Sequence, residues 1–164
     1  MKPHRLKMKA FGPFAEETVV DFDAMGNSVY LICGDTGSGK TTIFDGVMYA
    51  LYGTASGGAR SALGTEAFHS DFSKSGERRE EMRVELSFSN AGRTYTVFRR
   101  MYWGKKGSAQ RPSKESALSE EGNVLLTGRG REDVDDVSLK VREILGLDAD
   151  QFRRIIMLAQ GEFQ

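Results

Sequence analysis

Apolar residues recur along the chain at two spacings, and the shorter spacing predicts two β-hairpins. Residues 5–11 and 17–22 have β-rich composition and flank the turn signal Gly12-Pro13. Apolar and polar residues alternate strictly over residues 82–88, and residues 94–101 are rich in tyrosine, valine, phenylalanine and threonine. We therefore expect two pairs of antiparallel strands.

The longer spacing, three to four residues, predicts helices. Residues 43–51 carry an apolar side chain every four positions, as one buried helix face requires. Residues 134–145 form a second such face, which Gly146 is expected to end, and residues 148–154 predict a short third helix. Residues 53–80 lose this period and are rich in glycine, serine and charge, which predicts a long surface loop or lobe.

A glycine-rich loop with the spacing of a P-loop precedes the first helix. Its pattern is Gly34-x4-Gly39-Lys40-Thr41, and it follows the apolar run 28–33, which predicts the strand before the loop. Glycines let backbone N–H groups point inward at phosphate oxygens, and the helix adds its positive N-terminal end. The expected nucleotide-binding residues are Gly34, Asp35, Thr36, Gly37, Ser38, Gly39, Lys40, Thr41 and Thr42.

Length and charge limit the class of protein. A chain of 164 residues has room for one domain with one adequate core. Its 23 basic and 23 acidic residues imply no attraction of the whole surface to nucleic acid or membrane. The sole cysteine, Cys33, is expected to be a small buried core residue. No segment is long and apolar enough for a membrane span, so we expect a cytoplasmic protein with no membrane partner.

One stretch of the neutral chain is locally basic. Residues 86–114 contain no carboxylate and seven lysines or arginines, with Tyr102 and Trp103 among them. This stretch could lie against DNA phosphates or a partner. It could equally be a solvated hairpin face whose arginines pair with the acidic residues 132–136, and Trp103 could pack beneath the loop. The candidate DNA contacts are Arg99, Arg100, Lys105 and Lys106.

Three motifs together resemble the N-terminal ATPase lobe of the SbcC family. The members of this family are bacterial ATPases of DNA double-strand-break repair, related to SMC proteins. The first is the opening Leu6-Lys-Met-Lys-Ala-Phe-Gly-Pro-Phe14, and the second is the P-loop with its helix, residues 34–53. The third is the terminal Met157-Leu-Ala-Gln-Gly-Glu-Phe163. The resemblance spans the whole chain, and the three motifs in this order are more specific than the P-loop alone.

The resemblance implies that residues 1–164 are the N-terminal lobe of an ABC-type ATPase head. The implied fold is an α/β P-loop NTPase in which a P-loop strand and helix belong to a mixed sheet flanked by the antiparallel hairpins. In that family the chain continues into a long antiparallel coiled coil and returns as a C-terminal lobe with the signature motif and Walker B. We therefore expect this chain to be a fragment of a longer protein.

The same resemblance implies the cofactors and partners. The cofactors are ATP and Mg²⁺. The complete protein is expected to dimerise through its heads around two ATP molecules and to work with an SbcD-type nuclease. Together they would process the ends and hairpins of double-stranded DNA as an ATP-dependent exonuclease complex. The isolated chain is expected to be inactive, because the remaining catalytic groups lie on the C-terminal lobe.

The roles that the resemblance implies fall on three residues. Lys40 lies at the β- and γ-phosphates and, with Gln160, is the expected catalytic group. Thr41 and Gln160 are the expected Mg²⁺ ligands. Gln160 is the Q-loop glutamine, whose amide oxygen completes the metal shell or orients the attacking water.

Two departures from related sequences limit these assignments. Gly12 stands where archaeal and eukaryotic relatives place an arginine near the phosphates. His69 stands where close bacterial relatives often have arginine, so we expect a surface histidine without an assigned role. Arg60 stays open between a phosphate or DNA contact and a solvated loop residue.

Two other classes of P-loop protein are weighed against this interpretation. A small-molecule kinase needs a complete site in one chain, and no strand here ends in a Walker B carboxylate. A transporter-type nucleotide-binding module needs an aromatic residue that stacks on adenine before the P-loop, a role that Phe22 or Tyr30 fits poorly. Heptads after residue 164 would favour the SbcC interpretation, and an immediate Leu-Ser-Gly-Gly signature would favour the transporter.

Overall fold

The structure is a computed structural model that describes residues 1–26, 29–57, 64–75, 78–103, 112–130 and 136–156. The strands are β1 Lys2–Lys9, β2 Thr18–Asp21, β3 Lys74–Ser75, β4 Arg78–Arg79, β5 Met82–Asn90, β6 Arg93–Tyr102, β7 Ser113–Glu120 and β8 Asn123–Gly130. The α-helices are α1 Lys40–Tyr52, α3 Asp136–Leu145 and α4 Ala149–Ile156. Short 3₁₀ helices are η1 Asp23–Met25, η2 Thr65–Phe68 and η3 Asp71–Ser73.

Within these ranges, six strands form one sheet in the order β2-β1-β5-β6-β7-β8. Each neighbouring pair is antiparallel. Strands β3 and β4 form a separate two-stranded ribbon. Both predicted hairpins are confirmed, as β1–β2 and β5–β6. A third hairpin, β7–β8, joins the sheet beside β6 and was not predicted.

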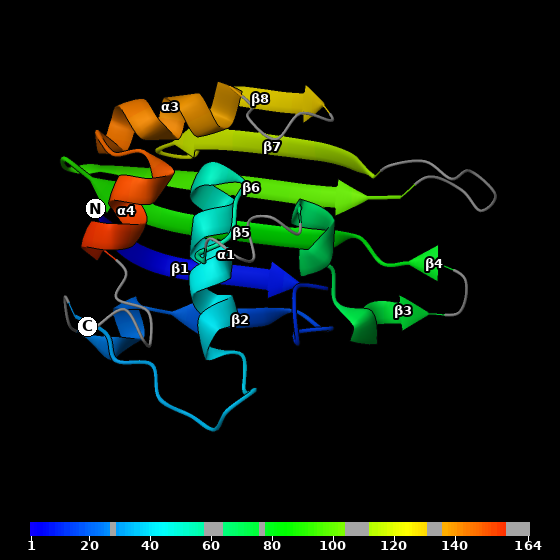
Figure 1. Cartoon of the computed structure of the whole chain (residues 1–164). Helices are drawn as coiled ribbons and strands as arrows, with labels where there is room; N and C mark the ends of the chain where they lie inside the picture. The colour runs from blue at the N-terminus through cyan, green and yellow to red at the C-terminus, as the bar shows by residue number, and fades with distance from the viewer. Residues whose placement is uncertain (27–28, 58–63, 76–77, 104–111, 131–135, 157–164) are drawn as a thin grey trace.

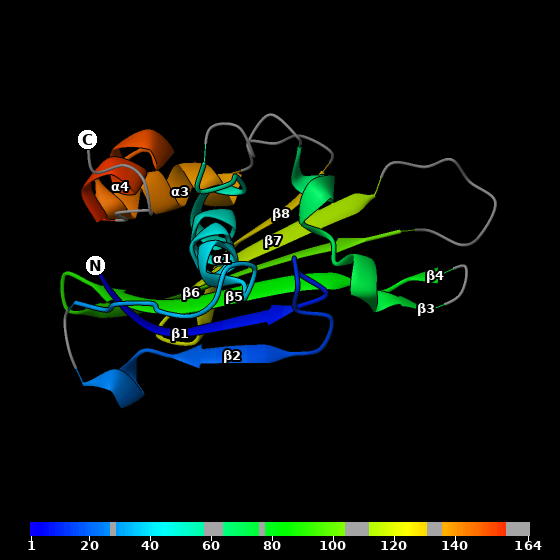
Figure 2. The ribbon, with the colours of Figure 1, turned by 60° about the horizontal axis from the view of Figure 1, so that its bottom comes forward.

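The α-helices lie on one face of the sheet, as Figures 1 and 2 show. Helix α1 packs on β1, β5 and β6, and α3 packs on β7 and β8. Helix α4 lies against α1, at the end of the sheet where β1 begins (Figure 1). The predicted helices at residues 43–51, 134–145 and 148–154 correspond to α1, α3 and α4, and none of the helices in the described ranges is long and apolar enough to span a membrane.

The alternation in the strands separates an apolar face from a charged one. Leu6, Met8, Val84, Leu86 and Val97 are fully buried on the face that the helices cover. Cross-strand partners share a face of an antiparallel sheet, and Leu6 pairs with Leu86 while Met8 pairs with Val84. The opposite face carries polar and charged side chains, among them the ion pair between Lys7 and Glu85, whose Nζ and Oε1 lie 2.8 Å apart.

A glycine lets α1 approach the sheet closely. A Cβ atom built on Gly46 would lie 2.6 Å from Sδ of Met8 and 3.3 Å from Cδ2 of Leu6. Both of these side chains are fully buried and have little room to move. Position 46 therefore sets the distance between the helix and β1.

Polar contacts fix the C-terminal end of α1. Gly53 has φ of 70° and donates its N–H to the Tyr49 carbonyl oxygen at 2.9 Å, which ends the helix in a left-handed cap. Asp45 accepts hydrogen bonds at Oδ1 from the N–H and the hydroxyl of Ser56, at 2.9 and 2.6 Å. These two contacts turn the chain back along the helix that it has just left.

The ends of α3 and α4 follow the signals in their sequence. Gly146 ends α3, as predicted, with φ of 69° and a 2.8 Å bond from its N–H to the Arg142 carbonyl oxygen. At the start of α4, Oδ1 of Asp148 accepts the Gln151 N–H at 2.9 Å, and Oε1 of Gln151 accepts the Asp148 N–H at 3.0 Å. This reciprocal pair is a capping box. The hydroxyl of Tyr52 donates to the Leu147 carbonyl oxygen at 3.0 Å and ties both helices to α1.

Candidate nucleotide site

Residues 34–39 form a loop that leads directly into α1. Gly37 and Gly39 have φ of 85° and 91°, values that residues with a Cβ atom rarely adopt. The N–H of Ser38 donates to the Asp35 carbonyl oxygen at 3.1 Å and closes a turn inside the loop. The P-loop pattern therefore has the backbone conformation for which its glycines are required.

The N-terminus of α1 is open to an anion. Its N-cap residue is Gly39, which has no side chain to accept hydrogen bonds from the first N–H groups, and no acidic residue lies in the first turn. The first N–H groups of a helix have no intrahelical partner and carry the positive end of its dipole. The loop and the first turn of α1 therefore present backbone donors of the kind that bind phosphate.

Lys40 folds back over the loop. Its Nζ donates to the carbonyl oxygens of Gly34 and Asp35, at 2.7 and 2.6 Å. These contacts hold the ammonium group against the start of the loop, close to the backbone donors that an anion would meet. The residues present thus fit a phosphate chain, with Lys40 as the mobile charge and the hydroxyl of Thr41 at the helix start.

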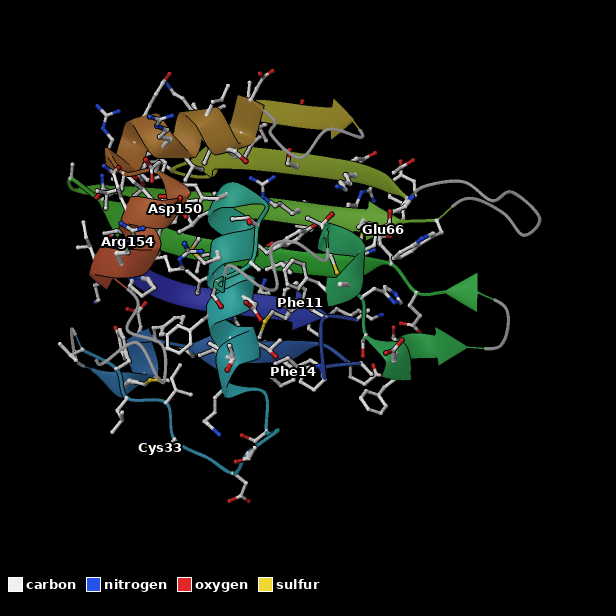
Figure 3. The ribbon with its side chains drawn as sticks, viewed as in Figure 1. Phe11, Phe14, Cys33, Glu66, Asp150 and Arg154 are labelled. Atoms are coloured by element: carbon white, nitrogen blue, oxygen red, sulfur yellow. The ribbon has the colours of Figure 1, made fainter. Side chains whose placement is uncertain are left out.

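The predicted P-loop strand is wrong for this structure. Residues 29–35 form no strand, and Val29 and Leu31 are 85% and 89% exposed. Cys33 is exposed as well, which corrects the expectation of a buried core cysteine. Figure 3 shows Cys33 on the extended segment that leads into the loop. A strand needs a hydrogen-bonded neighbour, and no described strand pairs with this segment.

A hairpin turn of the sheet touches both the loop and α1. Residues 11–14 connect β1 to β2, and Phe14 lies beside the N-terminal end of α1 (Figure 3). A Cβ atom built on Gly39 would lie 2.8 Å from Cζ of Phe14. Gly12 meets α1 one turn further on, where its own Cβ would lie 2.6 Å from Cγ2 of Thr42. With glycine at position 12, the turn brings no charged side chain to the loop.

His69 is buried, contrary to the expected surface histidine. It is 7% exposed, and its Nε2 donates to the Glu80 carbonyl oxygen at 2.8 Å. The rings of His69 and Trp103 pack edge to face, with centroids 4.5 Å apart. Trp103 thus packs beneath this segment, which was one of the two alternatives for it. These contacts tie His69 to the residue Glu80 before β5 and to Trp103 after β6.

The two arginines predicted as DNA contacts point to opposite faces of β6. Arg99 is 5% exposed on the helix-covered face, where Nε donates to the Ala50 carbonyl oxygen at 2.7 Å. Its Nη2 donates to the Leu51 carbonyl oxygen at 3.3 Å and to Oγ of Ser138 at 2.8 Å. A guanidinium group held between α1 and α3 is directed into the protein, which argues against a contact with DNA.

Arg100 lies on the open face but has acidic partners. Its Nε donates to Oε2 of Glu115 at 2.7 Å, and its Nη1 lies 3.5 Å from Oε1 of Glu81. The hydrogen bond to Glu115 raises the pKa of Arg100, and a hydrogen bond from Arg83 holds the pKa of Glu81 below its usual value. Arg100 therefore pairs with a carboxylate of β7 and one just before β5, while the acidic residues 132–135 lie outside the described ranges.

Several predicted functional residues also lie outside the described ranges. These are Lys105 and Lys106 of the basic stretch, Arg60 in the loop after α1, and Gln160 in the terminal motif. The position that sequence reasoning did not assign to the site is Phe14, where the hairpin turn meets the loop. The turn signal Gly12-Pro13 was recognised, but nothing local in the sequence indicated what the turn packs against.

Comparison with known proteins defines the family. The AAA domain family matches residues 5–164, so this chain belongs to that family. The chain is also similar over its whole length to the SbcC subunit of the nuclease SbcCD from Staphylococcus aureus strain MRSA252, with 34% identity over 165 residues. The SbcC subunit of the same nuclease from Vibrio cholerae serotype O1 is 33% identical over 172 residues. These relatives confirm the resemblance to SbcC proteins, and the chain spans 16% of the length of each.

A solved structure is similar in part. The SMC head domain from Thermotoga maritima aligns with 77% of this chain and 39% of its own, at 18% identity and a TM-score of 0.39. The family match and the α/β arrangement of helices on a sheet confirm the predicted P-loop ATPase fold class. Within the described ranges the sheet is antiparallel rather than mixed, because residues 29–35 add no strand to it.

Replacing Arg99 by methionine tests its structural role. Arg99→Met leaves the carbonyl oxygens of Ala50 and Leu51 buried without these donors, so we expect the free energy of unfolding to fall by about 2–4 kcal/mol. Arg100→Met is the matched control on the open face, where the ion pairs of Arg100 are partly exposed and are expected to contribute about 1 kcal/mol. Urea denaturation measures both changes. An Arg99→Met protein of unchanged stability that binds DNA more weakly would contradict the structural assignment.

Proposed function

We propose that this chain is the ATP-binding N-terminal lobe of an SbcC-like ATPase head. The observation that carries the proposal is the loop of residues 34–39, which closes onto the uncapped start of α1 with Lys40 folded over it. Such a loop is suited to a polyphosphate, and the relatives of similar sequence are components of a nuclease. In this proposal the complete protein is an ATPase that acts in an ATP-dependent DNA exonuclease complex.

The proposal assigns a role to each group of the site. Backbone N–H groups of residues 37–42 bind the phosphates, and Lys40 approaches the β- and γ-phosphates. The Thr41 hydroxyl and the Gln160 amide hold Mg²⁺, which neutralises charge on the phosphates when it is bound. Lys40 must exchange its contacts with Gly34 and Asp35 for the nucleotide. That exchange is favourable because phosphate oxygens carry full charge and carbonyl oxygens do not.

The exposed segment before the loop supports a head made of two lobes. Val29, Leu31 and Cys33 are exposed, while Tyr30 and Ile32 between them are partly buried, which is the alternation of a strand with one face on the protein. The Tyr30 hydroxyl is buried and has no hydrogen-bond partner among the described residues. Buried polar groups are normally paired. We infer that a C-terminal lobe, which the resemblance implies, covers this segment and completes the sheet.

The remaining partners follow from the same proposal. Two heads dimerise around ATP, an SbcD-type nuclease joins them, and the assembly processes the ends and hairpins of double-stranded DNA in the cytoplasm. On this lobe the DNA contacts of the proposal are Lys105 and Lys106, with Arg100 of the same basic stretch. Arg100 already pairs with two carboxylates, which makes it less available to a phosphate.

Removing the P-loop lysine tests nucleotide binding. Lys40→Ala deletes the mobile charge, and because hydrogen bonds between charged groups contribute about 1.5–3 kcal/mol each, we expect at least about a tenfold loss of Mg-ATP affinity. Calorimetry on the head reconstituted from both lobes measures this loss. Lys140→Ala on α3 is the matched control, since that lysine pairs with Glu143 and lies away from the loop. An unchanged affinity in a folded Lys40→Ala head would refute the site.

Charge reversal in the basic stretch tests the DNA surface. We expect Lys105→Glu with Lys106→Glu to weaken duplex binding by the complete complex about equally for all sequences. The salt dependence of binding should flatten by about one unit for each lost phosphate contact. The charge-preserving double variant Lys105→Arg with Lys106→Arg should bind as the unmodified protein does. If the reversed variant keeps both its affinity and its salt slope, the stretch is a solvated surface.

A further inference from the structure

Hydrogen bonds within the hairpin turn of residues 11–14 hold its shape. The N–H of Phe11 donates to the Phe14 carbonyl oxygen at 2.9 Å, and the N–H of Phe14 donates to the Phe11 carbonyl oxygen at 3.0 Å. Pro13 fixes its own φ, and Gly12 has φ of 57°, which glycine adopts without strain. Next to the turn, the N–H of Ala10 donates to the Ala15 carbonyl oxygen at 3.1 Å, and short segments then lead into β1 and β2.

The turn is anchored on the side away from the loop. Gly12 donates its N–H to the Phe68 carbonyl oxygen at 2.7 Å, and Ser70 donates its N–H to the Ala10 carbonyl oxygen at 2.9 Å. The fully buried ring of Phe11 packs on Phe68 with centroids 5.2 Å apart, and on Tyr49 of α1 at 5.7 Å. Two segments that are distant in the sequence, residues 64–73 and α1, thus hold the turn in one place.

The opposite side of the turn contacts the nucleotide site at two positions, Gly39 and Thr42. The backbone of Gly39 leaves no room for a side chain, since its Cβ would lie 2.8 Å from Cζ of Phe14 and 3.0 Å from Cγ of Pro13. The backbone of Gly12 leaves none either, since its Cβ would lie 2.6 Å from Cγ2 of Thr42. Gly39 ends the loop and Thr42 lies in the first turn of α1, so both contacts fall where the phosphate donors are.

We propose that the Phe11–Phe14 turn positions the P-loop: Phe14 holds Gly39, and Gly12 holds Thr42, so that the turn sets nucleotide affinity without touching the nucleotide. This inference rests on the proposed function of the loop. The donors of the site are backbone N–H groups, whose directions change together when Gly39 or Thr42 is displaced. A shift of about 1 Å in such groups can cost up to about a hundredfold in function. The turn therefore acts as a fixed support, and its four residues are positioning residues.

A double-mutant cycle between Gly12 and Thr42 tests the direct contact. Gly12→Ala places a methyl group against Cγ2 of Thr42, and we expect it to weaken Mg-ATP binding by the reconstituted head by about tenfold or more. Thr42→Ser removes Cγ2 and keeps the hydroxyl, so Gly12→Ala should cost much less in that background. The cycle removes two separate effects from the comparison. One is the effect of Thr42→Ser by itself, and the other is the backbone strain of alanine at positive φ, which is the same in both backgrounds. An equal loss in both backgrounds overturns the proposal.

A series at Phe14 tests the second contact and does not depend on Gly12. We expect Phe14→Ala to weaken Mg-ATP binding by about tenfold, and Phe14→Leu, which keeps an apolar side chain against Gly39 without adding an atom at the Cζ contact, to lose less. Phe88→Leu is the control for lost stability alone, because Phe88 is buried in β5 against Tyr95. It should lower the denaturation midpoint and leave affinity unchanged. If Phe14→Ala loses stability but keeps full affinity, the turn is a structural element only and the proposal is wrong.

The Lys40→Ala head separates failure of this inference from failure of the proposed function. If the unmodified head binds Mg-ATP and Lys40→Ala abolishes binding, the nucleotide site is established. Turn variants that then keep full Mg-ATP affinity refute the positioning role alone. When the unmodified head does not bind Mg-ATP, the nucleotide site itself is refuted and the positioning role with it.

Discussion

The close packing of α1 on the sheet is the constraint on which the rest of the structure depends. Gly46 brings the helix within contact of Leu6 and Met8, and neither side chain has room to move aside. At the far end Arg99 binds the last carbonyl oxygens of the helix, and at the near end the turn of residues 11–14 meets its first residues. The direction of α1, and with it the direction of its N–H groups toward a phosphate, is therefore set by the sheet.

Local patterns in the sequence predicted the elements but not all of their neighbours. Strict alternation over residues 82–88 identified β5, and the apolar spacing over residues 43–51 identified α1, because each element buries one face. The hairpin β7–β8 was missed because Ser113–Glu120 is mostly polar and takes its place by pairing with β6. The sequence Glu121-Gly122 marked its turn, where both residues have positive φ, 48° and 82°.

The errors at Cys33, His69 and Arg99 share one cause. Each prediction judged a residue by its neighbours in the sequence, whereas burial depends on segments far along the chain. Trp103 and the carbonyl oxygen of Glu80 bury His69, and the end of α1 binds Arg99. Cys33 is exposed, and in the described ranges its apolar segment pairs with no strand. The nucleotide site was easier to predict, because the P-loop is a short continuous motif whose conformation follows from its own glycines.

The central claim is that this chain is one lobe of an ATPase head and that the other lobe completes it. The most direct measurement is the rate of ATP hydrolysis by the purified chain, alone and after co-expression with the C-terminal lobe. The account predicts no turnover by the chain alone, and turnover with ATP-dependent dimerisation when both lobes are present, because groups that stabilise one transition state act as a unit. Turnover by the chain alone, which Lys40→Ala abolishes, would contradict the two-lobe head.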